Sequence, residues 1–242
     1  MNIAIKEHHP ASESAIIHID GLDAKKLLQG QLTINLDCLP AKTFKLAAQC
    51  NPQGRVISLF DIAEHQGAYY LILPESMVSI AINALKKYAI FYKVTITPTL
   101  AIPFEYALPA KADRIRAGIP MIYPNTSGCF LPHELNLPSL QAVSFDKGCY
   151  TGQEIIARME YRGKLKKHLH VATTTSASPI APNDEAYIKT NNGKEFRATI
   201  VDSAVDKTDN HVILLICDDA DAKNEHLYIG ADNNPILFSR QP

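Results

Sequence analysis

The sequence predicts an α+β fold followed by a smaller β domain. Three observations support this prediction. In the first hundred residues, β-branched apolar runs alternate with stretches of helical periodicity, and the predicted elements follow the order strand, helix, strands, helix, strand. After Lys167, only short β-like runs occur. We therefore expect a sheet with helices on one face and place the domain boundary near residue 166. The two predicted domains are residues 1–166 and 167–242.

The apolar spacing of the first region predicts each element in turn. The β-branched run Ser14 to Ile19 predicts a strand, and Leu22 to Gln29 has helical spacing, with Leu22, Leu27 and Leu28 on one side. The elements expected next are strands over Phe44 to Cys50, Arg55 to Glu64 and Ala68 to Leu73, a helix over Glu75 to Tyr88, and a strand over Val94 to Thr97.

Turn signals separate these elements. Asn51-Pro52-Gln53-Gly54 indicates a tight turn, and His65-Gln66-Gly67 indicates a hairpin. Prolines recur between Thr99 and Pro138, which predicts a loop-rich connection with one or two helical turns over Asp113 to Ala117.

The C-terminal region has a different texture. Asn191-Asn192-Gly193 predicts a hairpin turn. Five short strands separated by turns favour a small barrel or curled sheet. The expected strands are His168 to Thr173, Ala186 to Thr190, Glu195 to Val201, His211 to Cys217 and Leu227 to Ile229.

Composition restricts the possible partners and the compartment. Hydrophobic residues make up 46% and charged residues 20% of 242 residues, and the net charge is −1, so there is no global attraction to nucleic acid or to an acidic membrane. The five cysteines form no CxxC pair, so neither a zinc site nor an iron–sulfur site is predicted. Free thiols, no secretory signal and no bilayer-spanning run predict a cytoplasmic protein without a membrane partner.

The stretch Lys147-Gly148-Cys149-Tyr150-Thr151-Gly152-Gln153-Glu154 carries most of the chemistry in the chain. Two glycines allow tight turns and close approach of a ligand to the main chain. Lys147 and a helix beginning near Gly152 would both favour a thiolate at Cys149. The alternative is that Cys149 is a small buried hydrophobic residue. A hydrolase nucleophile is disfavoured, because no histidine has a recognisable spacing to this cysteine.

Two further groups of cations are candidates for binding. One group is Arg158, Arg162, Lys164, Lys166 and Lys167, which could hold polyglutamate, phosphate or RNA, or could simply be a solvated face. In the other, Arg114 and Arg116 point different ways on a helical turn, so one could face a cleft and bind a heterocycle or a carboxylate. A structural ion pair is the alternative.

Several of these motifs together resemble the YgfZ-type folate-binding proteins, relatives of the glycine-cleavage T-protein. The most specific is KGCYTGQE at residues 147–154, followed by Tyr161-Arg162-Gly163. The similarity covers roughly residues 14–170. The other matching runs are Gln29-Gly30-Gln31-Leu32-Thr33, Asn51-Pro52-Gln53-Gly54-Arg55, Arg114 to Pro120 and Phe130 to Leu137.

The resemblance implies a T-protein-like cloverleaf around a central channel that accepts a folate, with a small C-terminal β-barrel domain. It also implies a link to iron–sulfur cluster maintenance and to some tRNA modification. On this basis tetrahydrofolate or a derivative is the expected cofactor, and iron–sulfur client proteins are the expected partners. The resemblance supports tRNA as a partner only indirectly. The expected ligand contacts are Arg116, Arg162, Tyr150, Gln153 and Glu154. Cys149 is the expected functional thiol, Lys147 its tuner, and Gly148 and Gly152 shape the loop.

The chain departs from the T-protein at its acidic positions. The T-protein pattern G-G-x-x-D-D falls on Gly54 to Leu59, so Ser58 and Leu59 replace its two aspartates, and Arg116 stands where the T-protein has a glutamate. We therefore predict that the chain is not an aminomethyltransferase. Two alternatives to the folate-binding accessory protein are a one-carbon transferase with another substrate and an RNA-binding tRNA-modification factor.

Overall fold

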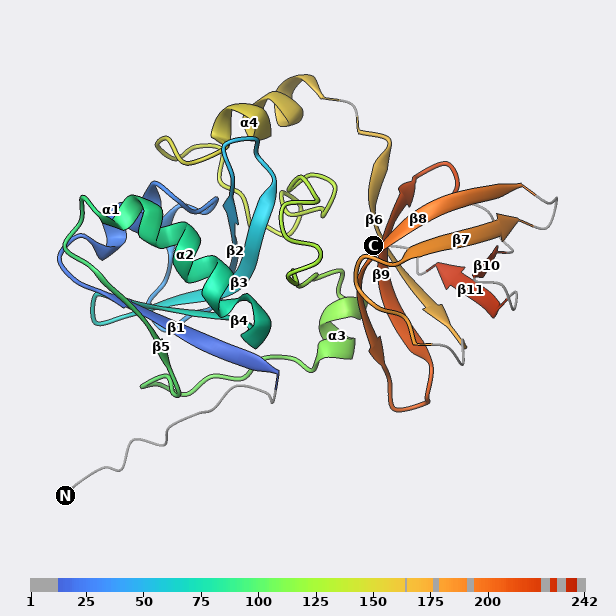
Figure 1. Cartoon of the computed structure of the whole chain (residues 1–242), viewed down its shortest axis with the longest axis horizontal. Helices are drawn as coiled ribbons and strands as arrows, with labels where there is room; N and C mark the ends of the chain where they lie inside the picture. The colour runs from blue at the N-terminus through green and yellow to red at the C-terminus, as the bar shows by residue number, and fades with distance from the viewer. Residues whose placement is uncertain are drawn as a thin grey trace. The chain divides into compact units, whose positions relative to one another are not determined.

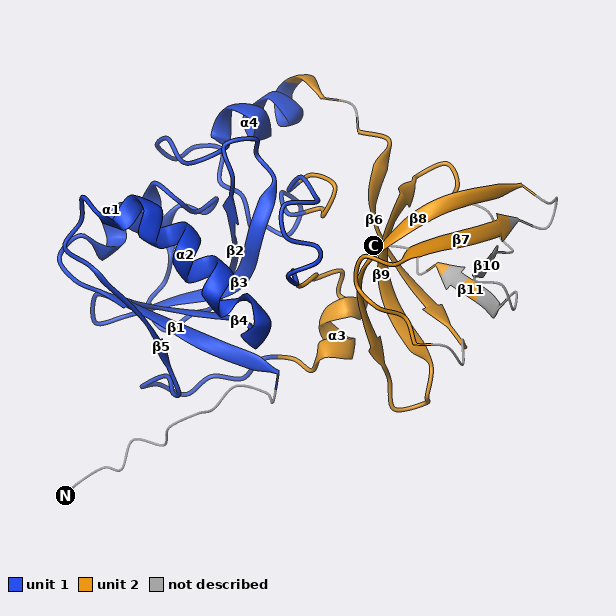
Figure 2. Ribbon diagram, in the orientation of Figure 1, with its two compact units in different colours: residues 1–108, 122–132, 137–161 blue, residues 109–121, 133–136, 162–242 orange. Residues whose placement is uncertain are grey.

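The computed structural model describes residues 13–163, 165–175, 179–190, 194–222, 227–229 and 234–238. The chain forms two compact units (Figure 2). The first comprises Met1–Leu108, Ile122–Pro132 and Leu137–Tyr161, and the second comprises Pro109–Met121, His133–Asn136 and Arg162–Pro242. The last change from the first unit to the second falls between Tyr161 and Arg162, and the boundary was predicted near residue 166. The observed units differ from the predicted domains because two short segments of the proline-rich connection, Pro109–Met121 and His133–Asn136, belong to the second unit.

The first unit is built on a five-stranded antiparallel sheet in the order β2-β3-β4-β1-β5 (Figure 1). All five strands were predicted from the sequence, and their bounds differ from the expected ones by one or two residues. The strands are β1 (Ser14–Asp20), β2 (Lys45–Cys50), β3 (Val56–His65), β4 (Ala68–Pro74) and β5 (Thr95–Thr99).

The turn between β3 and β4 confirms the predicted hairpin. Gln66 and Gly67 have φ values of 54° and 85°, the left-handed conformation that a two-residue hairpin turn needs at both central positions. The strands on either side pair from His65 with Ala68 up to Asp61 with Ile72. This tight connection fixes the register of the two most buried strands of the sheet.

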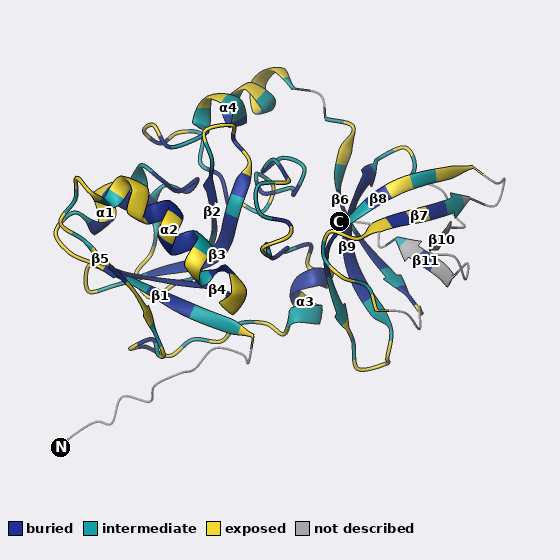
Figure 3. Cartoon of the chain, in the orientation of Figure 1, coloured by how far each residue is buried: buried dark blue, intermediate teal, exposed yellow. Residues whose placement is uncertain are grey.

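Both faces of this sheet are covered, which explains why every residue of β4 is buried (Figure 3). The helix α2 (Val78–Ala89), preceded by a 3₁₀ turn at Glu75–Met77, packs on β1, β3 and β5. On the other face, Ile102 and Phe104 join Ile16, Tyr70 and Ile72 in an apolar cluster. The apolar spacing of α2 was therefore read correctly from the sequence.

The first helix, α1 (Ala24–Gln29), is shorter than predicted. Leu27 and Leu28 are buried as expected, but Leu22 lies before the helix and is 90% exposed. The expectation that Leu22 belongs to the buried side of this helix was wrong, because the chain is still in the connection after β1 at that residue.

The described residues of the second unit form six antiparallel strands in the order β10-β11-β6-β9-β8-β7, and β10 also pairs with β7. The five C-terminal runs expected to be strands are all strands, and β11 was not predicted. The strands are β6 (Lys167–Thr174), β7 (Glu185–Thr190), β8 (Glu195–Val205), β9 (His211–Asp218), β10 (Leu227–Ile229) and β11 (Asn234–Phe238). The hairpin turn predicted at Asn191 to Gly193 lies outside the described residues.

A short helix, α3 (Lys111–Arg116), belongs to this second unit because polar contacts hold it to β8. The Lys111 ammonium lies 3.1 Å from the fully buried carboxylate of Asp202, whose other oxygen accepts a hydrogen bond from the Met121 amide at 3.2 Å. A buried carboxylate needs such partners. None of the helices among the described residues is long and apolar enough to cross a membrane.

Candidate functional site

The motif at residues 147–154 lies in the first unit, in the loop that leads into helix α4 (Gln153–Arg162). The helix begins where the sequence predicted, directly after Gly152. The loop is held on its scaffold by contacts with two distant parts of the chain: residues 29–34 and residues 51–54.

Lys147 provides the first contact. Its ammonium donates hydrogen bonds to the carbonyl oxygens of Gln29 at 2.8 Å, Leu32 at 2.7 Å and Ile34 at 2.7 Å, and the side chain is buried. Three acceptors satisfy all three donors of the ammonium. Burial lowers the pKa of this amine to about 8, while the Asp37 carboxylate acts in the opposite direction.

Thr151 and Gln153 provide further hydrogen bonds. The Thr151 amide donates to the Gly30 carbonyl at 3.1 Å, and its hydroxyl donates to the side-chain oxygen of Gln31 at 3.2 Å. The Gln153 side-chain oxygen accepts a 3.3 Å hydrogen bond from the Tyr150 amide. The two Thr151 bonds connect the motif to Gly30 and Gln31, whereas the Gln153 bond closes the turn within the motif.

Gly152 makes the closest backbone contact of the motif. Its φ is +85°, and a Cβ built on it would lie 2.6 Å from the Asn51 carbonyl oxygen and 3.0 Å from the Cα of Gly54. Gly54 in turn has φ +74° and lies against the side chain of Ile155. Both positions require glycine, because the backbone conformation is left-handed and the two chain segments touch.

Three motifs that are far apart in the sequence therefore meet in one place: the QGQLT run, the NPQGR turn and KGCYTGQE. Each motif is recognisable in the sequence, but the sequence does not indicate that the three lie together in the structure. The contacts missed were Gln31 as the acceptor for Thr151 and the carbonyls of residues 29–34 as acceptors for Lys147. The only signal in the sequence was that polar motifs of unusual composition occurred at all three positions.

Within this frame, neighbouring residues of the motif have opposite environments. Gly148 and Cys149 are exposed, whereas Tyr150 is 7% exposed, and its ring lies 5.0 Å from the Lys147 ammonium. The Tyr150 hydroxyl has no hydrogen-bond partner among the described residues. Burial, followed by the nearby Cys50 thiol, raises the pKa of the Tyr150 phenol. A buried hydroxyl without a partner is costly, so it marks a place where a ligand atom or a water molecule can bind.

The geometry around Lys147 bears on its predicted tuning of Cys149. The Lys147 ammonium bonds to three main-chain oxygens, while the thiol two residues later is exposed. The tuning of Cys149 by Lys147 stays a prediction. The structure shows, in addition, that Lys147 holds the loop to residues 29–34 through its three hydrogen bonds.

The positions that match the T-protein aspartates are buried in β3. The Ser58 hydroxyl donates to the side-chain oxygen of Gln49 at 3.2 Å, and Ser58, Gln49 and Leu59 are all at most 1% exposed. Ser58 and Leu59, neither of which carries a charge, therefore occupy the two positions where the T-protein pattern has aspartates.

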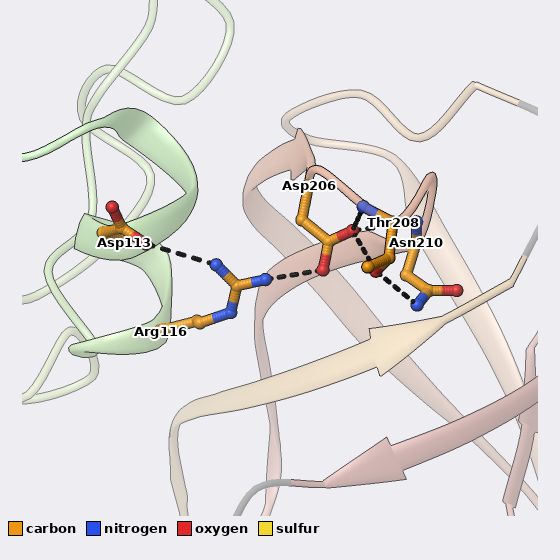
Figure 4. Close-up of polar contacts among 5 residues, drawn as sticks. All are labelled: Asp113, Arg116, Asp206, Thr208 and Asn210. Carbon is orange, nitrogen blue, oxygen red and sulfur yellow. Dashed lines mark hydrogen bonds and ion pairs between the residues drawn. The ribbon is translucent and has the colours of Figure 1, made fainter.

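The predicted folate contacts Arg116 and Arg162 belong to the second unit. The Arg116 guanidinium bonds to the Asp206 carboxylate at 2.5 Å and to Asp113 at 3.3 Å (Figure 4). Asp206 also accepts hydrogen bonds from the amide and hydroxyl of Thr208. These contacts match the alternative of a structural ion pair, and a ligand role for Arg116 stays a prediction.

The remaining predicted residues lie on or near α4. Glu154 is exposed and forms an ion pair with Arg158 at 3.6 Å, one helical turn along. Arg162, Lys166 and Lys167 are exposed, and Lys164 lies outside the described residues. No group of three or more histidine, cysteine or acidic side chains suited to a metal ion occurs in the described part of the chain.

Comparisons with known proteins identify the class and then the family. No protein-family model matches the chain. Its fold is similar to the crystal structure of glycine cleavage system aminomethyltransferase T from Bartonella henselae, with a TM-score of 0.71 at 11% identity over 94% of this chain and 83% of that one. The fold is therefore that of the T-protein class.

Proteins of similar sequence identify the family within this class. The tRNA-modifying protein YgfZ of Buchnera aphidicola is 32% identical over 228 residues, covering 67% of this chain and 72% of its own. The protein of that name from Sodalis glossinidius is 26% identical, covering 94% of this chain and 89% of its own. The chain belongs to the YgfZ family of tRNA-modifying proteins, as the sequence motifs predicted.

Proposed function

We propose that the protein binds a folate and supports the assembly or repair of iron–sulfur enzymes, and through them some tRNA modification, with Cys149 as its functional thiol. The observation that supports this most strongly is that three motifs converge on one loop. This loop presents an exposed thiol next to a buried hydroxyl that has no hydrogen-bond partner in the described part of the chain. A loop held by contacts with two other segments positions a reactive group more accurately than a free loop does.

The residues of the loop fit a folate. Tetrahydrofolate carries one-carbon units and offers a polar heterocycle that can hydrogen-bond to a buried phenol. The Tyr150 hydroxyl is such a group. Gln153 already uses its side-chain oxygen on the Tyr150 amide, so it holds the loop, and its amide nitrogen remains available as a donor. The cloverleaf arrangement with a central channel is part of the same proposal.

The alternatives receive less support. A one-carbon transferase that resembles the T-protein would use a carboxylate where this chain has the uncharged residues Ser58 and Leu59, and the Ser58 hydroxyl is hydrogen-bonded to Gln49. Direct RNA binding by the basic cluster is supported by the names of the relatives. Against it, one cation of the cluster, Arg158, is already paired with Glu154.

The first test concerns folate affinity. Titration calorimetry with tetrahydrofolate and its 5-formyl form should show saturable binding to the wild type. We expect Tyr150→Phe to weaken it about 5- to 10-fold, the value of one hydrogen bond, since the substitution removes only the hydroxyl. Tyr161→Phe is the matched control, because that ring is 72% exposed, and its affinity should equal that of the wild type.

The same titration tests the second predicted contact. Arg116→Ala is expected to weaken binding about tenfold if its guanidinium holds the glutamate tail of the ligand. Affinity equal to the wild type would remove Arg116 from the site and leave it as the partner of Asp206. Lack of binding to both folates by the wild type would reject the folate proposal as a whole.

The second prediction concerns the thiol. Cys149→Ser is expected to abolish support of iron–sulfur enzymes while the far-UV spectrum and the unfolding midpoint stay unchanged, because the side chain is exposed and of similar size. Cys129→Ser is the matched control, since Cys129 is also exposed and lies in the same unit. The measurement is the activity of an iron–sulfur enzyme in cells that lack the wild-type protein. A fully active Cys149→Ser variant would exclude the thiol from the mechanism.

A further inference from the structure

Two loops meet at one end of the sheet in the first unit. One follows β1 and the other precedes β5, and these strands pair there, Asp20 opposite Thr95. The loops are fastened together. The Lys93 amide donates to the Asp23 carboxylate at 2.8 Å, and Gly21 lies so close that an added Cβ would be 2.3 Å from the Lys93 carbonyl oxygen.

These fastened loops expose three large apolar side chains, Leu22, Ile90 and Phe91, which we call the apolar tip. Their exposed fractions are 90%, 79% and 86%. Ile90 and Phe91 are the two central residues of a turn closed by a 2.9 Å hydrogen bond from the Tyr92 amide to the Ala89 carbonyl. They therefore project from the end of α2, and exposed apolar patches of this kind usually mark an interaction surface.

Lysines flank the apolar tip. Lys86 and Lys87 are exposed in the last turn of α2, Lys93 is exposed beyond the turn, and the Lys26 ammonium lies 5.8 Å from the centre of the Tyr92 ring. The sequence contains no acidic residue between Glu75 and Glu105. The acidic residues of the opposite loop are Asp20 and Asp23, which accept hydrogen bonds from the amides of Gly21 and Lys93.

We propose that the apolar tip is a docking site for an anionic lipid surface. An anionic bilayer attracts lysines at its headgroups and accepts apolar side chains beneath them. The other anionic occupants fit less well. Nucleic-acid bases stack on aromatic rings, whereas two of the three tip residues are aliphatic, and protein interfaces are depleted in lysine. The net charge of −1, which gave no expectation of a membrane partner, conceals this local patch.

The chain contains no tryptophan, so Phe91→Trp introduces a single fluorescent reporter at the tip. On addition of vesicles of 30% phosphatidylglycerol in phosphatidylcholine, we expect its emission to move to shorter wavelength and to increase. Leu100→Trp is the matched control, because Leu100 is 82% exposed but follows the opposite end of β5, and its emission should not change.

Vesicle sedimentation measures how much the lysines and the apolar side chains each contribute to partitioning onto the vesicles. The double substitution Lys86→Gln with Lys87→Gln should reduce partitioning about 25-fold, because each lysine near an anionic surface contributes about fivefold. Lys166→Gln with Lys167→Gln, an equally exposed neighbouring pair elsewhere, should leave it unchanged. Phe91→Ser should also reduce it, and circular dichroism should show an intact fold.

Three results would overturn the proposal. One is an unchanged emission of Phe91→Trp at saturating phosphatidylglycerol vesicles. Another is equal partitioning into pure phosphatidylcholine, which would exclude recognition of the anionic headgroup. The third is quenching of the reporter by single-stranded RNA without any response to vesicles, which would assign the tip to nucleic acid.

Discussion

Gly152→Ala is expected to lower the free energy of unfolding by about 3 kcal/mol, from a left-handed conformation that costs ~1–2 kcal/mol and an overpacked contact that costs ~1–3 kcal/mol. The new Cβ would lie 2.6 Å from the Asn51 carbonyl oxygen and 3.0 Å from the Gly54 Cα. Both are main-chain atoms, so neither can swing away as a flexible side chain would. Urea denaturation followed by circular dichroism measures the change.

Gly148→Ala is the matched control in the same motif. Gly148 is exposed, and nothing lies within 4 Å of a Cβ added there, so we expect a change within about 0.5 kcal/mol. Equal stability of the two variants would mean that the loop moves freely away from residues 51–54. Folate affinity and the function of Cys149 should fall with Gly152→Ala and persist with Gly148→Ala, if loop geometry positions the site.

The elements that local sequence signals specify were predictable. The β3–β4 hairpin has Gln66 and Gly67 at the two positions that need positive φ, and α2 has an apolar face repeated every three or four residues. Such signals act within a few residues, so the sequence contains them completely. The start of α4 after Gly152 belongs to the same group.

Features that depend on distant partners were not predictable. Leu22 continues the apolar spacing of α1 but lies in a loop fastened to Lys93, and α3 belongs to the second unit because Lys111 reaches Asp202 in β8. Spacing along the chain does not report such contacts. The strand β11 was missed for a related reason, because Pro235 within it weakens the strand signal and its pairing with β6 supplies the register.

The candidate site shows the same limit. The residue types of the motif at residues 147–154 led to the correct family, and the chemistry assigned to the motif stays a prediction. The hydrogen-bond partners of Lys147 could not be predicted, because its closeness to Cys149 in the sequence suggested the thiol as its partner. Its observed hydrogen-bond partners lie more than a hundred residues earlier, at Gln29, Leu32 and Ile34.

Lys147→Met is therefore expected to destabilise the first unit by about 4 kcal/mol. Methionine retains the length of the side chain but leaves three carbonyl oxygens without their donor, and each buried unsatisfied group costs about 1–3 kcal/mol. Lys166→Met is the control, because that lysine is exposed, and its effect should stay within about 0.5 kcal/mol. Urea denaturation at pH 7.5 measures both variants.

The pH dependence of the same pair tests the state of the amine. The folded-state pKa of Lys147 is about 8, below the unfolded value near 10.4, so between these values the unfolded chain binds more protons. Stability conferred by Lys147 should then rise with pH, by at most about 1.4 kcal/mol per unit. The difference between the wild type and Lys147→Met should be constant below pH 7 and widen from pH 8 to 9.5. A difference that shrinks over this range would mean that the three carbonyls favour the ammonium more than burial opposes it.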